Sequence, residues 1–340
     1  MSPAADAAPA TGTGQDDIVG FTGRALGSWL KLFVRTPAGS EGAAPATACE
    51  QAWAAVQAEF AAVDAALSRF RGDSELTALN RLAGTGGVAL VSWRLRTMLA
   101  AVHRAARLTG GRFDPTVIDV LERIGEPGAG LAGRAAARTA RGRVALVAPG
   151  TPRASLVRIP ALPVDSGGIG KGLALRWAAA AAGAALPAGS GILLDAGGDI
   201  VCGGVPPAGG WRIGVDDPMA PVGAAALPLA VCALVRGGVS TSSVAVRNWT
   251  GPDGERVHHL VDPATRAPAR TGLIAVSVAG PDPAWNEVWS KALFLGGSES
   301  IGEEARRRGM AAWWVDAGGR LGMTPEARVR SAWVAEARVG

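Results

Sequence analysis

A glycine-rich stretch that contains one lysine and runs directly into an alanine-rich stretch most constrains how this chain can fold. Residues 164–172 are Val-Asp-Ser-Gly-Gly-Ile-Gly-Lys-Gly, and residues 171–185 predict a helix. Glycine lets a backbone turn tightly and approach a ligand closely, and the first N–H groups of a helix can bind an anion. Lys171 adds a point charge suited to phosphate. The segment predicts an anion-binding turn or, alternatively, a tight structural turn, because its spacing matches neither a Walker nor a Rossmann loop.

A second segment places two imidazoles close to a carboxylate. Residues 258–263 are His-His-Leu-Val-Asp-Pro, and the proline stiffens the turn that they form. An imidazole titrates near neutral pH, which suits proton transfer. Together the two segments suggest an enzyme that handles a phosphorylated ligand. The alternative is a structural turn accompanied by a histidine at the surface.

Composition and charge exclude several classes of protein. The chain has 340 residues, 48% of them hydrophobic, which allows a substantial core. Its net charge of +5 favours an anionic small ligand. The arginines are dispersed and form no basic stripe with aromatic residues, so we expect no nucleic-acid partner. Cys49, Cys202 and Cys232 are too sparse for a disulfide framework or a zinc site and are expected to be buried as small apolar side chains.

The chain divides into a short tail and one domain. Residues 1–17 are mostly Ala, Pro, Gly and Asp and predict a disordered tail, and residues 18–340 are expected to form a single domain. The N-terminus lacks the basic and apolar regions of a secretory signal, and no apolar stretch is long enough to span a membrane. The sequence therefore predicts no membrane span and a cytoplasmic location.

Helical patterns come early in the domain, and short strands dominate later. Helices are expected at residues 47–70, 94–108, 171–185, 283–294 and 299–307. Strands are expected at residues 28–34, 144–147, 157–159, 192–195, 211–215, 230–235, 257–261, 274–278, 311–315 and 329–334. Because helices and strands do not alternate regularly, the pattern favours an α+β fold over a doubly wound sheet.

Eight sequence blocks, collinear over nearly the whole chain after the tail, carry a specific resemblance. They lie at residues 68–80, 111–117, 164–172, 194–200, 211–218, 239–243, 259–263 and 276–296. Among them are Leu-Asp-Ala-Gly-Gly-Asp-Ile, Trp-Arg-Ile-Gly-Val-Asp-Asp-Pro and His-Leu-Val-Asp-Pro. In content and order these blocks resemble the ApbE family, the FAD:protein FMN transferases. The resemblance implies an α+β fold of mixed or antiparallel short-stranded sheets packed with several helices.

The resemblance also implies a reaction. Such enzymes bind FAD, split its pyrophosphate and pass FMN to a Thr or Ser hydroxyl of a target protein, with release of AMP and with support from Mg²⁺. The expected partners are therefore FAD and an acceptor protein with a Thr or Ser flavinylation site. Two alternatives are a flavin-binding homologue with a degenerate metal site and little transferase activity, and an FAD pyrophosphatase that releases free FMN.

Within this resemblance, His259 is the candidate general base for the acceptor hydroxyl, and Lys171 is the candidate catalytic cation. An alternative role for His259 is to fix its loop through Asp262, while His258 and His103 are expected on the surface or on a helix face. A larger set of residues is expected to bind FAD. They are Ser74, Glu75, Asn80, Asp114, Thr116, Asp165, Gly167, Gly168, Lys171, Gly197, Gly198, Thr241, Ser242 and Asp262.

Several of these residues also have local structural interpretations. Residues 74–80 resemble a helix N-terminus, and residues 114–116 predict a turn or a helix start with Asp114 as N-cap and Pro115 at the first helical position. Thr241 and Ser242 would be ordinary polar residues at a strand end. The sequence alone leaves both the structural role and the FAD-binding role of these residues open.

The metal site is where the chain departs from the family. The resemblance implies a metal ligand at the main-chain carbonyl of Gly170 and two more at the positions of Glu287 and Lys291, where the family has Asp and then Thr or Ser. Glutamate can bind Mg²⁺, but a charged lysine has no lone pair to offer. We therefore expect weak Mg²⁺ binding, with the Lys291 ammonium partly replacing the metal. The chain also departs from the family's sequence pattern at three further positions, which are Arg176, Ser243 and Arg266.

Overall fold

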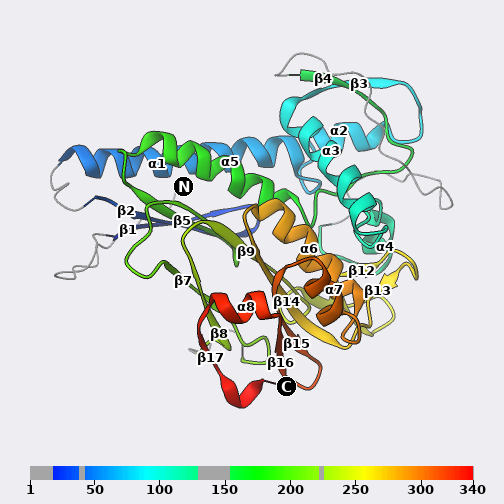
Figure 1. Cartoon of the computed structure of the whole chain (residues 1–340). Helices are drawn as coiled ribbons and strands as arrows, with labels where there is room; N and C mark the ends of the chain where they lie inside the picture. The colour runs from blue at the N-terminus through cyan, green and yellow to red at the C-terminus, as the bar shows by residue number, and fades with distance from the viewer. Residues whose placement is uncertain (1–17, 38–42, 129–153, 222–225, 340) are drawn as a thin grey trace.

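A long antiparallel sheet runs through the middle of the protein (Figure 1). The structure, a computed structural model, describes residues 18–37, 43–128, 154–221 and 226–339, so the predicted tail and the predicted strand at residues 144–147 lie outside the described residues. In spatial order the sheet contains β1 (Ile18–Ala25), β2 (Ser28–Arg35), β5 (Gly191–Ala196), β6 (Asp199–Gly204), β9 (Gly237–Ser243), β14 (Leu273–Gly280), β15 (Ala311–Asp316) and β16 (Leu321–Met323). All neighbouring pairs in this sheet are antiparallel.

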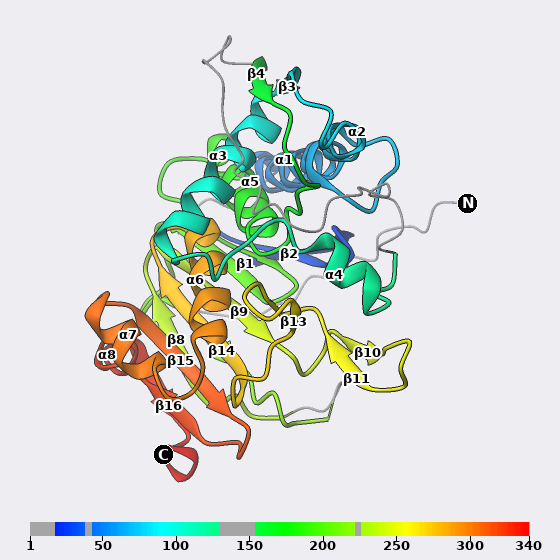
Figure 2. The ribbon, with the colours of Figure 1, turned by 90° about the vertical axis from the view of Figure 1, so that its right-hand side faces the viewer.

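Helices cover one face of this sheet (Figures 1 and 2). They are α1 (Ala43–Leu67), α5 (Gly170–Ala185), α6 (Pro283–Gly296) and α7 (Ile301–Arg307). Because side chains alternate between the two faces of a strand, Leu30, Leu32 and Val34 of β2 all enter the core under α1 and α5. Val276 and Val278 of β14 enter a second core with α6 and α7.

A smaller sheet covers the opposite face. It consists of β7 (Trp211–Val215), β8 (Ala230–Leu234) and β17 (Ser331–Val334), in the order β17-β8-β7. Trp211 and Ile213 of β7 share a core with Leu193 of β5 and with the fully buried Trp313 of β15. The described structure is therefore built of three layers, with helices on one side of the long sheet and the smaller sheet on the other.

Shorter elements surround these layers. They are α2 (Glu75–Arg81), α3 (Trp93–Leu108), α4 (Ile118–Arg123), α8 (Pro325–Arg330), the antiparallel pair of β3 (Val88–Ser92) with β4 (Ala154–Arg158), and the two hairpins of β10 (Asn248–Thr250) with β11 (Arg256–His258) and of β12 (Val261–Asp262) with β13 (Ala267–Pro268). The β10–β11 and β12–β13 hairpins lie at the side of the molecule that also carries α4 (Figure 2). The loops between these shorter elements bring two predicted site segments, 111–117 and 259–263, toward the central sheet.

The predicted α+β class is confirmed, and most predicted elements are present. Two strand predictions are wrong in detail. The strand expected at residues 257–261 is divided between β11 and β12, which pair with different partners. The first part of the strand expected at residues 329–334 belongs to α8, because Thr324 accepts a hydrogen bond from Ala327 N as N-cap and Pro325 opens the helix.

Four strands of the long sheet were missed by the sequence analysis. They are β1, β6, β9 and β16. Glycine and serine, which are frequent in β6 and β9, have low strand propensity, so their pairing depends on burial between the two outer layers. Tertiary packing, not local preference, therefore determines β6 and β9.

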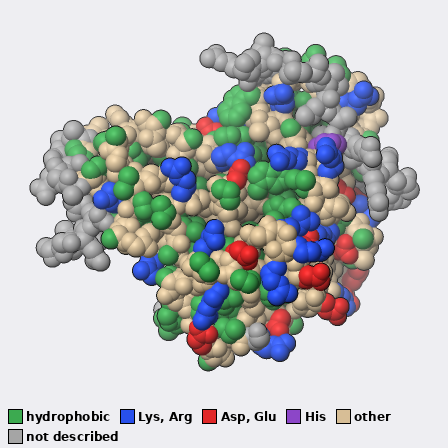
Figure 3. All heavy atoms as spheres, viewed as in Figure 1, with side chains coloured by type: hydrophobic (Ala, Val, Ile, Leu, Met, Phe, Trp, Pro, Cys, Tyr) green, Lys and Arg blue, Asp and Glu red, His purple; other side chains and the backbone are tan. Residues whose placement is uncertain are grey.

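The burial of the cysteines and the mixed charge of the surface agree with what the composition predicts. Cys49, Cys202 and Cys232 are free thiols in buried positions, as predicted. On the face shown in Figure 3, basic side chains are interspersed with acidic and apolar ones. Within the described ranges, no helix combines the length and hydrophobicity needed to cross a bilayer.

Candidate functional site

A cavity of about 1430 Å³ brings together segments that are far apart in the sequence. It is bounded by the N-terminus of α5, the β5–β6 turn, the end of β9, one side of α6 and the loops near Arg69, Asp114 and His259. Its polar and glycine lining includes Arg69, Asp114, Glu126, Asp165, Gly167, Gly168, Gly170, Lys171, Gly197, Gly198, Asp199, Thr241, Ser242, Arg247, His259, Ser277, Glu287 and Lys291.

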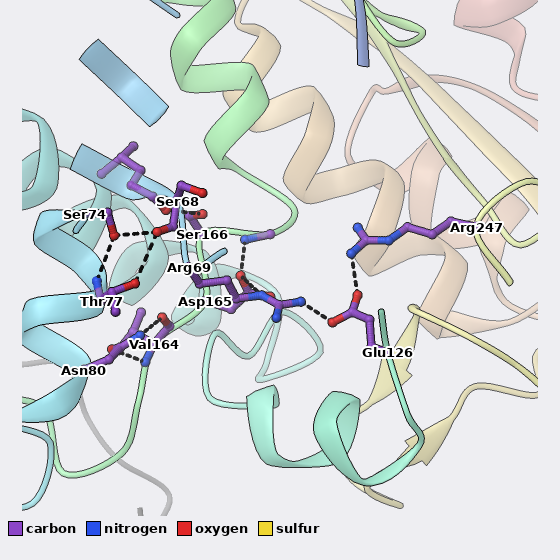
Figure 4. Close-up of polar contacts among 12 residues, drawn as sticks. Ser68, Arg69, Ser74, Thr77, Asn80, Glu126, Val164, Asp165, Ser166 and Arg247 are labelled. Atoms are coloured by element: carbon purple, nitrogen blue, oxygen red, sulfur yellow. Dashed lines mark hydrogen bonds and ion pairs between the residues drawn. The ribbon is translucent and has the colours of Figure 1, made fainter. Parts of the chain in front are cut away.

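The first half of the glycine-rich turn is fixed by side chains from neighbouring segments (Figure 4). The amide nitrogen of Asn80 donates to the Val164 carbonyl at 2.9 Å, and the amide oxygen of Asn80 accepts from Val164 N at 2.8 Å. The Ser166 hydroxyl donates at 2.8 Å to a carbonyl at the end of α1. Asp165 accepts from Gly167 N at 2.9 Å. The turn is therefore ordered by the protein itself before a ligand arrives.

Glycine is required at position 168 for two reasons. The residue has φ of +93°, a conformation that other residues rarely adopt. A Cβ there would also lie only 2.7 Å from Cε of Lys291 and 3.1 Å from Cε2 of Phe113. The missing side chain lets Lys291 cross the turn and donate to the Gly167 carbonyl at 3.2 Å.

A glutamate from α6 caps the N-terminus of α5. The N-cap residue of α5, Ile169, forms no capping bond of its own. The carboxylate of Glu287 accepts from Gly172 N at 2.8 Å and so satisfies one of the free N–H groups of the first turn. A second tie between the two helices is the ion pair of Arg176 with Asp282, at 2.6 Å.

Lys171 lies in the first turn of α5 and pairs with Asp199 at the start of β6. Gly197 and Gly198 form the turn that precedes Asp199, with φ of +65° and +91°. The other carboxylate oxygen of Asp199 accepts from Thr241 N at 3.3 Å. Burial lowers the pKa of Lys171, but the carboxylates of Asp199 and Glu287 outweigh this effect and raise the pKa above its ordinary value. Lys171 is therefore a permanent cation, and its pairing offsets the unfavourable helix dipole.

Two ionisable side chains of α6 line the same region. Burial raises the pKa of Glu287 to about 7, and the nearby charge of Asp199 acts in the same direction. Burial lowers the pKa of Lys291, while Asp165 and Glu287 oppose this shift. Glu287 and Lys291 bond to different backbone groups, Gly172 N and the Gly167 carbonyl.

A buried chain of charges connects the glycine-rich turn with the segment before β10 (Figure 4). Arg69 donates to Asp165 at 3.0 Å and also pairs with Glu126, which in turn pairs with Arg247. The side chains of Arg69 and Glu126 are only 3% and 1% exposed. Because the Arg247 carbonyl bonds with His259, this chain links the turn to the candidate base.

The two adjacent histidines have different roles. Nε2 of His258 bonds the Ala269 carbonyl at 3.1 Å and its Nδ1 accepts from Leu260 N at 3.3 Å, so both ring nitrogens hold the loop. His258 is half-buried there, and its predicted surface position is wrong. Nδ1 of His259 lies 3.2 Å from the Arg247 carbonyl. A carbonyl only accepts, so Nδ1 carries the proton and Nε2 carries the lone pair.

The charge state of His259 follows from its surroundings. Burial lowers its pKa to about 3, and the positive charges of Arg247 and Lys291 add to the effect. The imidazole is therefore neutral at physiological pH. The interpretation in which Asp262 fixes His259 is not supported, because Asp262 accepts from Ala264 N instead.

Comparison with known proteins places this arrangement in a family. The model of the ApbE family matches residues 31–314. The chain belongs to the ApbE family. It is 28% identical over 275 residues to an FAD:protein FMN transferase from Klebsiella pneumoniae (strain 342), an alignment that covers 77% of this chain and 76% of that protein.

Solved ApbE structures share the fold. The ApbE protein of Thermotoga maritima is 24% identical, with a TM-score of 0.75 over 93% of this chain and 100% of that chain. The flavinyl transferase ApbE of Pseudomonas stutzeri, in its apo form, is also 24% identical, with a TM-score of 0.74 over 94% of this chain and 98% of that chain.

Some of the residues that the ApbE resemblance implied as FAD-binding lie outside the cavity lining. They are Ser74, Glu75, Asn80, Thr116 and Asp262. Ser74 caps α2, and Glu75 accepts from Ser92 N at 2.9 Å. Asp114 accepts from both the backbone and the hydroxyl of Thr116, which makes a turn, and α4 begins only at Ile118. The expected helix start with Asp114 as N-cap and Pro115 at the first helical position is therefore wrong.

The strand-end residues Thr241 and Ser242 of β9 each pair with another hydroxyl in this ApbE chain, on opposite faces of the sheet. Thr241 Oγ1 lies 2.7 Å from the Ser277 hydroxyl, and the Ser242 hydroxyl lies 2.9 Å from that of Ser290. Thr241, Ser242 and Ser277 line the cavity. The Thr241–Ser277 pair therefore gives the cavity a polar wall beside Asp199.

The positions at which the ApbE resemblance implied Mg²⁺ ligands do not fit a divalent cation. Lys291 presents an ammonium, which has no lone pair. One oxygen of Glu287 is already bonded to Gly172 N. Mg²⁺ requires an octahedral shell of oxygens. Among the described residues, no group of three or more His, Cys, Asp or Glu side chains is placed to hold a metal.

Sequence reasoning missed several groups in the cavity. Asp199 lies inside a quoted ApbE block and could have been found as the partner of Lys171. Arg69 also lies in a block. Its partner Glu126, and Arg247, which pairs with Glu126 in turn, lie in no motif. Only the tertiary fold brings these three side chains together.

Proposed function

We propose that this chain transfers the FMN half of FAD to a Thr or Ser hydroxyl of an acceptor protein and releases AMP. One observation carries the proposal: a single cavity in an ApbE fold is lined both by the glycine-rich turn with Lys171 and by the neutral imidazole of His259. Relatives of the chain are named FAD:protein FMN transferases. The cavity, about 1430 Å³, exceeds the volume of roughly 300–1,000 Å³ typical of small-ligand sites, so a dinucleotide has room.

The reaction is a single phosphoryl transfer without change of oxidation state. The acceptor oxygen forms a bond to the FMN-side phosphorus of the pyrophosphate. The bond between that phosphorus and the bridging oxygen breaks, and AMP leaves with the bridging oxygen. The hydroxyl proton passes to Nε2 of His259, which carries the lone pair.

Charge on the phosphoryl oxygens has to be stabilised during this transfer. Lys171 supplies a positive charge that its ion pair with Asp199 offsets in part, and the backbone of Gly167, Gly168 and Gly170 can approach the phosphates closely. Asp114, Asp165, Gly197, Gly198, Thr241 and Ser242 would contact other parts of FAD. Ser74, Glu75, Asn80, Thr116 and Asp262 would act indirectly by holding the loops.

The test is incubation of the purified protein with FAD and a bacterial lysate, followed by flavin fluorescence on a denaturing gel and measurement of AMP. We expect a fluorescent protein band together with AMP. AMP without a labelled protein would favour a pyrophosphatase. Bound but intact FAD would favour a flavin-binding homologue.

A further inference from the structure

The basic side chains that line the cavity differ in whether they form ion pairs with carboxylates. The lysines and arginines of the lining are Arg69, Arg71, Arg112, Lys171, Arg247 and Lys291. The first five each form an ion pair with at least one carboxylate. Within the described residues, the Lys291 ammonium instead donates a hydrogen bond to the Gly167 carbonyl. Lys291 is thus the cavity cation whose charge is not neutralised by contact with a carboxylate.

The carboxylates nearest to Lys291 are committed elsewhere. Asp165 accepts from Arg69 and from Gly167 N, and Glu287 accepts from Gly172 N. The ammonium lies against the glycine-rich turn, in the space that the absent Cβ of Gly168 leaves open. It also lies 5.8 Å from the centre of the Phe113 ring, which adds a weak attraction. Lys291 is therefore held at the turn with charge available for an anion.

We propose that Lys291 is the built-in cation that receives the pyrophosphate of FAD at the glycine-rich turn, so that this chain binds FAD without a divalent metal. The identity of the ligand rests on the proposed function. The ammonium occupies the place where the family resemblance implied a metal ligand, and the part of the chain that the structure describes has no group of three or more His, Cys, Asp or Glu side chains placed to hold a metal. A compact ammonium is suited to phosphate as a point charge.

The first test uses the unmodified protein. FAD affinity is measured by fluorescence titration in EDTA and again with millimolar Mg²⁺, and Mn²⁺ binding is measured separately by electron paramagnetic resonance. We expect the two FAD dissociation constants to agree within about twofold, a difference well under 1 kcal/mol, and we expect no stoichiometric Mn²⁺ binding. FAD binding that appears only with Mg²⁺, or tight binding of one Mn²⁺, overturns the proposal but leaves the proposed function standing. Absence of FAD binding under every condition overturns both.

The second test removes the charge. Lys291→Met should weaken FAD binding in EDTA by about tenfold or more, roughly the worth of one charge-assisted contact. Riboflavin, which has no phosphate, should bind wild type and variant equally. The matched control is Lys31→Met, because Lys31 is the only other lysine of the chain besides Lys171 and lies on β2, outside the cavity lining. Equal FAD affinity of Lys291→Met and wild type, or a parallel loss of riboflavin binding, contradicts the proposal.

Discussion

Replacement of Glu126 by alanine should destabilise the protein strongly. Glu126 is the shared partner of Arg69 and Arg247, and its side chain is 1% exposed. Removal of one member of a buried ion pair costs about 3–5 kcal/mol, because the other charge stays buried without its partner. Because Arg69 keeps its bond to Asp165, we expect the loss of stability to lie near the lower end of this range. Arg247 is half exposed, and its lost pairing adds at most about 1 kcal/mol. We therefore expect a loss of about 3–4 kcal/mol in the free energy of unfolding.

Urea denaturation followed by tryptophan fluorescence measures this loss. The matched control is Glu255→Ala, which removes a pair whose arginine and glutamate side chains are 91% and 72% exposed. That control should lose no more than about 0.5 kcal/mol. If Glu126→Ala lost less than about 1 kcal/mol, or no more than the control, the buried charge chain would not organise the site as argued.

Three further outcomes are expected. His259→Ala should reduce FMN transfer by about a hundredfold or more while FAD affinity, measured by titration, stays the same; an equal loss of affinity and rate would indicate a structural role. Gly168→Ala should lower the free energy of unfolding by about 1–3 kcal/mol, because φ is +93° and the new Cβ meets Lys291; thermal denaturation indistinguishable from wild type would contradict this. The pKa of Glu304 is lowered chiefly by its bonds to Arg112, so its pairing stabilises the protein above the ordinary glutamate pKa and is lost as the pH falls through the lowered value. Glu304→Gln should therefore narrow the stability difference between pH 7 and pH 3, and an unchanged difference in denaturation midpoints would refute the assignment.

Local signals in the sequence were sufficient for the elements that position the site. The glycine-rich turn and the alanine-rich helix after it were predicted close to the observed α5, and Pro283 marked the start of α6. Ser74 was also predicted as part of a helix start, and it caps α2. The caps of α2 and α6 depend on interactions within a few residues of one another, so a single sequence reports them, whereas the contacts that hold the glycine-rich turn come from distant residues such as Asn80 and Glu287.

Interactions between distant residues were not predictable in this way. Glu126 is 57 positions from Arg69 and 121 positions from Arg247, and no spacing rule connects them. His258 and His259 are adjacent and chemically identical in the sequence, yet backbone groups of Arg247, Leu260 and Ala269 leave only His259 with a lone pair on Nε2. Glu287 and Lys291 likewise make two separate contacts, with α5 and with the glycine-rich turn, that no spacing rule predicts.

The molar balance between AMP and protein-bound flavin tests the proposed transfer most directly. Purified protein is incubated with FAD and a bacterial lysate, the total protein is precipitated, and AMP, free FMN and covalently bound flavin are quantified from the same sample. The account predicts equal amounts of AMP and protein-bound flavin, no accumulation of free FMN, and loss of both products with His259→Ala. AMP matched by free FMN, or FAD recovered intact, would contradict it.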